Sequence, residues 1–599
     1  MGSTDSYRGS RKYLTCAVLT VQFRDIALSP TSVTRIPMHL LHRAAVRWVS
    51  FFLATIPPAT LAQQQPSAGS QLQQIQSAST VQSDKPDLQV STGLPQTAVM
   101  ESGAIVLIKG LQFAGATAIE ESELIRVSGF VAQSQYSVAE LRAMAARVTA
   151  HYRSLGYFVA QAYLPSQDIT DGVVRFTVLE GQFGQIKLRN QSGLADGVAN
   201  QLLGGLKSAD KVTSHALERR LLLLSDLPGI LVKSTLAPAS ERGATDLTVD
   251  IAPGQAASGS IEADNQGNRY TGTNRIGASI NINEPTGLGD AASLRVLSSG
   301  EGLVFGRASY QLQAGMFRLG AAYTTMRYML GEEFGSSQSS GTARVAGLFV
   351  NYPFVRSRNR NLSAQWSFDS KDFSDRPGVS LPGVSVDKNA LLSTLSLNGD
   401  LRDGSGTGLT TFTLSWTRGR IDLQNDVFLA NDSGSAQSNG TYDKVSYGLT
   451  RQQTLMSGTD LYLSLNGQWA SKNLDASEKF SLGGGTGVRA YPAGEASGDV
   501  GAILTLETRT NISGLIDRLP GQLQLIGFVD MGSVSINRFP WDAVSSNSRE
   551  LSGAGLGLNW IGPSNMFLKA YWAFKLGDAV ATSAPDASSR FWLQILKAF

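Results

Sequence analysis

The chain of 599 residues has one cysteine, Cys16, and four histidines. Cys16 lies in the leader described below, so the mature chain has no thiol for a disulfide bond or a thiolate metal site. His39 and His42 also lie in the leader, whereas His151 and His215 fall on predicted helices far apart in the sequence. This scarcity argues against a histidine-based catalytic triad and a multi-histidine metal site. We therefore expect no enzyme activity, no cofactor and no metal.

A strong net charge is also missing, since the formal value is +3. Residues 1–62 contain seven Lys and Arg but two acidic residues, which leaves 44 basic and 46 acidic residues in the rest of the chain, a net charge of −2. The basic isoelectric point of about 8.7 therefore reflects the leader. Net charge gives no reason to expect nucleic-acid binding.

The leader comprises residues 1–62. Residues 38–62 have the order of a secretory signal peptide: a basic segment, an apolar run, and small residues at Thr60 and Ala62 before a cleavage site. We interpret residues 1–37 as an overextended start. A short transmembrane anchor is the alternative, but a Pro-Pro pair interrupts the run, which is too short to span a bilayer.

Long apolar runs are absent after the leader, where no segment has 18 consecutive apolar residues. A secreted chain without a transmembrane helix is either soluble or a β-barrel. Residues 63–103 are rich in Gln and Ser and are interpreted mostly as linker. Residues 71–76 in this stretch can form a short helix, although composition alone favours disorder.

Residues 104–181 predict a compact α+β unit. A strand candidate at 105–113 precedes a capping box, Ser137 and Glu140, which starts a helix. Spacings of three and four residues place the apolar side chains of this helix on one face. The face consists of Leu141, Met144, Ala145, Val148, Tyr152 and Leu155, and two further strands are expected at residues 157–164 and 173–179.

Residues 182–254 repeat this plan. A strand at 183–188 begins the unit, a helix follows at 215–224, and strands at 230–236 and 245–251 complete it. Small α+β units of this kind leave sheet edges open. An open edge can accept an extended peptide as an added strand.

From residue 255 to residue 599 helical periodicity gives way to alternation of apolar and polar residues. Residues 461–469 and 566–574 are examples. Long polar stretches alternate with short turns, and the chain ends on an alternating strand with Phe599 last. These features favour a transmembrane barrel over the alternative, a soluble β-sandwich. At about 21 residues per strand and connection, the segment predicts an antiparallel barrel of roughly 16 strands with an aqueous lumen.

Two segments of this region carry the candidate site. Residues 480–499 are rich in glycine and contain Arg489 beside Tyr491, and residues 527–533 contain a single carboxylate, Asp530. A carboxylate that points into a barrel needs a cation, which an inward-folded glycine-rich loop can supply as Arg489. We predict that this ion pair is the latch of a protein-conducting barrel.

Plainer interpretations of the same loop are that its glycines provide flexibility and that Arg489 is one more lumen cation. The pattern Gly485-x-Gly487-x-x-Ala490 mimics a dinucleotide-binding motif. It does not open a βαβ unit, so a nucleotide site is not expected.

The chain resembles the TpsB transporters of two-partner secretion, the hemolysin and hemagglutinin secretion/activation proteins of the ShlB/FhaC/HecB type. Both α+β units look like POTRA domains, and residues 263–272 and 283–290 resemble the first barrel hairpin of that family. The family's loop motif and strand motif are matched as well. The matching residues are Phe480, Leu482, Gly483, Gly484, Val488, Arg489, Ala490 and Tyr491 in the loop and Phe528, Asp530 and Gly532 in the strand.

The resemblance implies an outer-membrane transporter of a Gram-negative bacterium, with POTRA domains in the periplasm and a 16-stranded barrel. Residues 72–76 look like the helix that plugs the pore in that family. The expected partner is a dedicated TpsA-type exoprotein (an adhesin, hemolysin or hemagglutinin), largely unfolded in transit and β-helical afterwards. Outer-membrane lipid and the periplasmic assembly machinery are further expected partners, and nucleic acid is not.

The alternatives are a BamA-like assembly factor, which usually carries more POTRA units, and a passive porin, which would have none. One residue departs from the family pattern, because the loop motif usually has glycine at the position of Ala490. If that glycine needs a positive φ, Ala490 would be mildly strained. We predict that Arg489→Ala cripples export and leaves barrel insertion intact.

Overall fold

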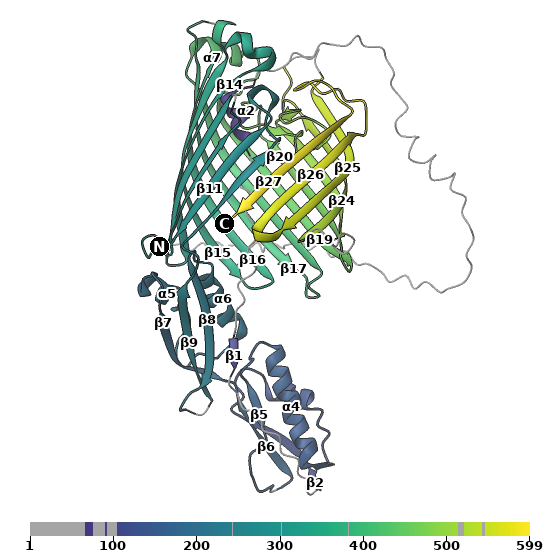
Figure 1. Ribbon diagram of the computed structural model, residues 1–599. Coiled ribbons are helices and arrows are strands. Elements are labelled where there is room, and N and C mark those ends of the chain that lie inside the picture. The colour runs from purple at the N-terminus through teal and green to yellow at the C-terminus, as the bar shows by residue number, and fades with distance from the viewer. Residues whose placement is uncertain are drawn as a thin grey trace, which may run out of the picture. The chain divides into compact units, whose positions relative to one another are not determined.

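The computed structural model describes residues 66–75, 90–92, 105–169, 171–241, 243–300, 302–380, 382–512, 520–541 and 546–599 (Figure 1). The chain divides into residues 1–60 and residues 61–599, and every described range belongs to the second part. The expected leader, residues 1–62, lies outside the described residues. None of the helices in the described ranges is both long and apolar enough to cross a membrane.

Two short elements lie within the expected linker. Helix α2 (Ala68–Gln73) begins three residues before the predicted helix, because Ser67 caps it by accepting a hydrogen bond from the Ser70 amide. Strand β1 (Val90–Thr92) was not predicted. It forms by parallel pairing with β8 (Ile230–Pro238), which a local pattern cannot indicate.

The first α+β unit packs one long helix against a small sheet. Its elements are β2 (Ile105–Ile108), β3 (Gly110–Ala114), α3 (Glu121–Ser128), β4 (Ser134–Ser137), α4 (Val138–Ser154), β5 (Gln161–Tyr163) and β6 (Val173–Leu179). The predicted capping box at Ser137 and Glu140 is present in both directions. The apolar face of α4 from Leu141 to Tyr152 is buried together with Phe113 and Phe176, whose rings stack at 5.4 Å. Leu155, which was expected on this face, is the C-cap of the helix and is 54% exposed.

The second α+β unit has the same layers. It consists of β7 (Gln182–Asn190), α5 (Asp196–Leu203), α6 (Ser214–Ser225), β8 and β9 (Ala244–Pro253). The sheet order is β1-β8-β9-β7, with β7 parallel to β9 and β8 antiparallel to it. Leucines of α6 fill the core beneath this sheet. We expected an open sheet edge in this unit, but β1 pairs with β8 and covers that edge.

The third part is a closed antiparallel barrel of sixteen strands, which confirms the expected fold class. The strands are β10 (Ala257–Asp264), β11 (Arg275–Asn283), β12 (Ala291–Ser298), β13 (Leu303–Ala314), β14 (Phe317–Met329), β15 (Ser340–Arg356), β16 (Arg360–Arg376), β17 (Val386–Arg402), β18 (Gly408–Leu423), β19 (Gly440–Met456), β20 (Thr459–Ala470), β23 (Val500–Asn511), β24 (Gln522–Ser535), β25 (Ser548–Gly562), β26 (Met566–Lys575) and β27 (Ser589–Ala598). The barrel closes where β10 pairs with β27, from Ser260 opposite Ala598 to Asp264 opposite Gln594.

The two ends of the barrel differ. At the end where β15 finishes, Arg356 binds Asp226 of the second α+β unit, and we call this the proximal end. The opposite, distal end carries helix α7 (Asp426–Ser433) between β18 and β19, visible at the top of Figure 1. Alternation along the strands exposes large apolar side chains on the outer wall, among them Trp366, Trp416 and Trp572.

Candidate functional site

The glycine-rich loop leaves the distal end of β20 and folds into the lumen between two short strands, β21 (Phe480–Ser481) and β22 (Ser497–Gly498). Its tip is a tight turn in which the amide of Val488 donates to the carbonyl of Leu482 at 2.8 Å. Gly484 adopts a φ of +118°, which favours glycine. A Cβ on Gly483 would overlap the carbonyl of Pro492, so the loop closes on itself only with glycine there.

This turn presents Arg489 to the carboxylate of Asp530 on β24. The guanidinium donates from Nε to Oδ2 and from Nη2 to Oδ1, each at 2.8 Å, and the Arg489 amide donates to Oδ2 at 3.1 Å. Arg489 is 4% exposed and Asp530 is fully buried. A bidentate pair of this kind fixes the orientation of the side chain as well as its position.

The remaining faces of the Arg489 guanidinium are also occupied. Nη1 donates to Oε1 of Glu507 on β23 at 2.8 Å, and the ring of Phe528 lies 3.5 Å from Cζ. The loop backbone is held too, because the indole of Trp592 on β27 donates to the carbonyl of Arg489 at 2.7 Å. The tip therefore contacts β23, β24 and the last strand of the barrel.

Gly532 and Ala490 explain how closely the loop approaches the wall. A Cβ on Gly532 would lie 3.0 Å from Leu482 and 3.1 Å from Val488, so the two motifs pack directly on each other. Ala490 is not among the residues with positive φ, and its side chain is buried against Gly553. The expected strain at Ala490 is therefore absent. The predicted site residue Tyr491 is fully buried, with the Lys575 ammonium 4.8 Å from its ring.

The stem of the loop, residues 471–479, has a second set of charged contacts on the opposite part of the wall. Glu478 receives Lys371 of β16 and Lys444 of β19, both at 2.7 Å. Asp475 receives Lys388 of β17 at 2.8 Å. The acidic side chains are almost fully withdrawn from water and each is paired with a lysine, as buried charges require.

Helix α2 lies in the lumen beside this stem. The amide of Ala68 donates to Asp375 of β16 at 2.8 Å, and the side chain of Gln73 donates to the carbonyl of Ser477. On its other side, Gln71 accepts a hydrogen bond from Thr271, and Gln74 accepts one from Asn268 at 2.9 Å. The helix thus occupies the pore and touches both the wall and the loop.

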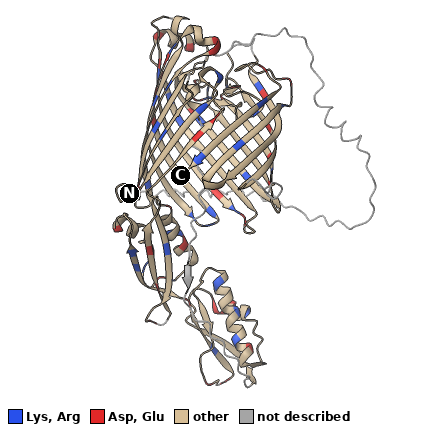
Figure 2. Cartoon of the chain, viewed as in Figure 1, with Lys and Arg blue, Asp and Glu red and all other residues tan. Residues whose placement is uncertain are grey.

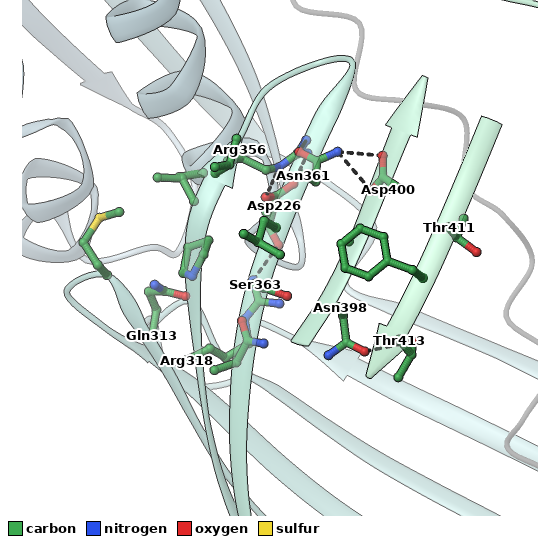
Figure 3. Close-up of a pocket in the computed structure, with 18 residues that line it drawn as sticks. Asp226, Gln313, Arg318, Arg356, Asn361, Ser363, Asn398, Asp400, Thr411 and Thr413 are labelled. Carbon is green, nitrogen blue, oxygen red and sulfur yellow. Dashed lines mark hydrogen bonds and ion pairs between the residues drawn. The ribbon is translucent and has the colours of Figure 1, made fainter. Parts of the chain in front are cut away.

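A polar cavity of about 500 Å³ opens at the proximal end, between α6 and the inner faces of β13 to β18 (Figure 3). Asp226 and Arg356 point toward each other at its edge, with Nε and Nη2 of the arginine 2.7 and 2.6 Å from the carboxylate. Asn361 donates to Asp400, and Thr413 donates to Asn398. Amide and hydroxyl groups therefore line part of the cavity, beside the charged side chains of Asp226, Arg356 and Asp400.

Several residues of this site were not expected from the sequence. Glu507 on β23 faces the lumen, as Asp530 on β24 does. Leu504 and Leu506 are exposed on the outer wall, so the residues that alternate with them, Thr505 and Glu507, face inward. This alternation is visible in the sequence. The ion pairs of Glu478 and Asp475 could not be predicted from the sequence, because they join segments that only the closed barrel brings together.

The comparisons with known proteins agree with this architecture. Residues 243–560 match the family described as haemolysin secretion/activation protein ShlB/FhaC/HecB. Residues 106–181 match the ShlB-type POTRA domain.

Named relatives cover most of the chain. The heme/hemopexin transporter protein HuxB of Haemophilus influenzae is 28% identical over 481 residues, which is 78% of this chain and 82% of the relative. The outer membrane transporter CdiB of Escherichia coli is 24% identical over 512 residues, 80% of this chain and 84% of the relative.

Solved structures show the same fold. CdiB from Escherichia coli has a TM-score of 0.65 at 20% identity and covers 85% of this chain and 93% of its own. BamA from Haemophilus ducreyi without its first three POTRA domains has a TM-score of 0.50 at 15% identity, covers 82% of this chain and 100% of its own, and shows the fold alone. From the family match, supported by these relatives, the chain belongs to the haemolysin secretion/activation proteins ShlB/FhaC/HecB, the outer-membrane transporters of two-partner secretion, with its POTRA domains in the periplasm.

Proposed function

We propose that Arg489 and Asp530 form the latch that keeps the loop inside the lumen of this transporter, and that export depends on it. The single observation that carries the proposal is the buried bidentate pair, with both Asp530 oxygens bound by the guanidinium. Removing one partner of such a pair leaves an uncompensated buried charge, which costs about 3–5 kcal/mol. Gly483, Gly484, Val488, Ala490 and Tyr491 shape the turn that delivers Arg489.

The family implies a secreted TpsA-type partner for this chain. We propose that the partner crosses as a largely unfolded chain and folds into a β-helix outside, as adhesins, hemolysins and hemagglutinins of this type do. The lumen supports crossing in an unfolded state, because α2 and the loop already occupy part of it and a folded domain would need far more room. The family assignment also favours export over the alternative of a BamA-like assembly factor.

The proposed route begins at the two POTRA domains. β1 covers the β8 edge of the second POTRA sheet, so an incoming strand at that edge has to replace β1. The exported chain then meets the cavity at the proximal end of the barrel, where Asn361, Asn398 and Thr413 offer hydrogen-bond donors and acceptors to its extended backbone. During biogenesis the barrel depends on the periplasmic assembly machinery, and afterwards outer-membrane lipid surrounds it.

The proposal is tested by co-expression of candidate TpsA-type exoproteins with and without this chain, followed by assay of the growth medium. We expect one dedicated exoprotein to appear in the medium only when the transporter is present. Secretion that is equal without the transporter, for every candidate, would overturn the assignment of a dedicated partner. A second readout, the insertion of unrelated barrels in cells lacking the transporter, would fall if the chain were an assembly factor.

A further inference from the structure

Two arginines near the distal end of the barrel point away from the lumen. On β14, Met326 and Tyr328 are buried on the lumen side, so Arg327 between them faces the outer wall, where it is exposed. On β15, Ala343 is buried in the lumen cluster and the exposed Arg344 next to it faces outward. Lys and Arg occur along the barrel strands toward both ends (Figure 2).

The strand register brings these two arginines together. Arg327 lies opposite Thr342 and Arg344 lies opposite Thr325, so the arginines are diagonal neighbours on one face. Diagonal neighbours in an antiparallel pair are about 7–8 Å apart between Cα atoms, within reach of one shared ligand. Arg344 also lies opposite Asp372 on β16.

Neither guanidinium forms an ion pair or hydrogen bond with a residue in the described part of the chain, Asp372 included. Two outward arginines of β18 at the same end are paired: Arg418 lies 3.6 Å from Asp443, and Arg420 donates to Asp422 at 2.9 Å. Arg327 and Arg344 on the β14–β15 wall therefore have no carboxylate partner within the described residues, whereas Arg418 and Arg420 on β18 each have one.

An apolar groove of about 560 Å³ lies on the same wall, on the proximal side of the arginines. Along β15 the outward residues after Arg344 are Ala346 and Leu348, each step being about 6.6 Å. Small side chains form its floor and exposed apolar ones its borders, with Leu348 63% and Tyr323 51% exposed. The floor includes Ala308, Ala321 and Ala346, and the borders include Tyr323, Leu348 and Phe368.

We propose that this wall binds a phosphorylated glycolipid of the outer leaflet, of the lipid A type, with one acyl chain in the groove and a phosphate held between Arg327 and Arg344. The distal end lies in the outer leaflet because the POTRA domains fix the proximal end in the periplasm. Guanidinium groups match phosphate oxygens in charge and geometry. The apolar groove on the proximal side of the arginines matches an acyl chain. Because a soluble phosphate has no acyl chain, the groove favours a lipid as the ligand. This inference does not depend on the proposed latch.

The headgroup half of the site is tested with the purified full-length protein in nanodiscs, titrated with lipid A and with its dephosphorylated form. We expect the wild type to prefer the phosphorylated form at least tenfold, because charge-assisted hydrogen bonds from guanidinium groups to phosphate are among the stronger kind. The double variant Arg327→Gln, Arg344→Gln should lose this preference. The matched control Arg420→Gln, whose arginine is already paired with Asp422, should keep it.

The groove half is tested with Ala346→Trp, which fills the floor. This variant should weaken binding of lipid A and leave phosphate-dependent binding of a deacylated analogue unchanged. Heat-modifiable migration on gels shows whether each variant is folded. Equal binding by the wild type and the double variant, or equal competition by phosphatidylglycerol, would overturn the assignment.

Discussion

Arg489 distributes its donors unequally between two carboxylates. Asp530 receives two guanidinium bonds and the backbone amide of Arg489, and it also accepts the hydroxyl of Thr505. Glu507 receives one bond from Arg489 and is shared with Arg509 at 2.8 Å. The orientation of the loop tip is therefore set chiefly by Asp530, with Glu507 as a support.

This difference predicts an order of effects for neutral substitutions. Asp530→Asn should reduce export about tenfold or more, because it weakens three bonds to the loop at once. Glu507→Gln should reduce export by less, since it weakens one charge-assisted bond, worth about 1.5–3 kcal/mol before Arg509 is taken into account. The measurement is the amount of exoprotein in the medium at equal levels of folded barrel. A stronger defect in Glu507→Gln than in Asp530→Asn would contradict this assignment of roles.

Glu180 is a buried carboxylate at the junction of the two α+β units. It accepts the amides of Thr117 and Ala118 at 2.6 and 2.7 Å and the hydroxyl of Tyr152 at 3.0 Å. Lys211 of the second α+β unit lies 2.8 Å away. Burial alone would raise the pKa of Glu180, but the hydrogen bonds from Lys211, Thr117 and Ala118 outweigh it and lower the pKa to about 2.

The lowered pKa of Glu180 predicts how the free energy of unfolding changes at acidic pH. The ionised form is favoured in the folded state, so its contribution is fully present above the unfolded pKa of about 4.5 and is lost as the pH falls toward 2. Between pH 6 and pH 3 the two α+β units should lose about 2 kcal/mol of stability from this group. Guanidinium unfolding of the full-length protein, followed by its helical circular dichroism, measures the loss. Glu180→Gln should remove this pH-dependent increment, and an unchanged pH profile in that variant would refute it.

At the scale of elements, α2 and the loop stem pack without space between them. Gly69 of α2 lies against Ser477, and a Cβ there would overlap both the Cα and the Cβ of Ser477. The two elements therefore fit together only when residue 69 has no side chain.

Gly69→Leu should consequently expel α2 from the lumen. We expect a higher single-channel conductance in planar bilayers and a greater sensitivity of cells to large antibiotics, with the Arg489 latch unchanged. Gly197→Ala serves as a control, because this glycine of α5 has nothing within 4 Å of its Cβ position. A closed channel in Gly69→Leu would show that α2 does not obstruct the pore.

Elements with a strong period of their own could be predicted from the sequence. The barrel strands alternate and α4 carries both a capping box and a continuous apolar face, so both were expected. Helix α3 was missed because its N-cap, Glu120, makes no side-chain cap, and β1 was missed because it depends on β8. The predicted strand at 105–113 is divided at Lys109, whose amide donates to the carbonyl of Gly172 rather than to a ladder.

The site shows the same limit. Arg489 and Asp530 could be matched because a lumen carboxylate requires a cation and the loop offers one. The lysines that bind Glu478 and Asp475 lie on three strands far away in the sequence, and several cations could have served. The strand register of the closed barrel decides which lysines pair with these two carboxylates.

At the scale of the whole transporter, one residue bridges the loop and α2 in addition to their direct contacts at Ser477. Asn268, in the connection between β10 and β11, donates to the side chain of Gln74 at 2.9 Å and to the carbonyl of Ala493 in the loop at 3.4 Å. A movement of the loop therefore disturbs the contact that holds α2. Opening the pore for an exported chain is expected to involve both obstructions together.

The central claim is that the inward position of the loop depends on Arg489 and that export depends on this position. The most direct measurement is the amount of exoprotein released by cells that produce Arg489→Ala, normalised to the heat-modifiable barrel in their outer membrane. Arg307→Ala provides the matched control, because this exposed lumen arginine donates to the Thr324 hydroxyl rather than to a carboxylate. We predict release of about a tenth of the wild-type amount or less for Arg489→Ala, given the roughly 3–5 kcal/mol cost of breaking a buried pair, and normal release for the control. Wild-type release by Arg489→Ala at normal barrel levels would contradict the account.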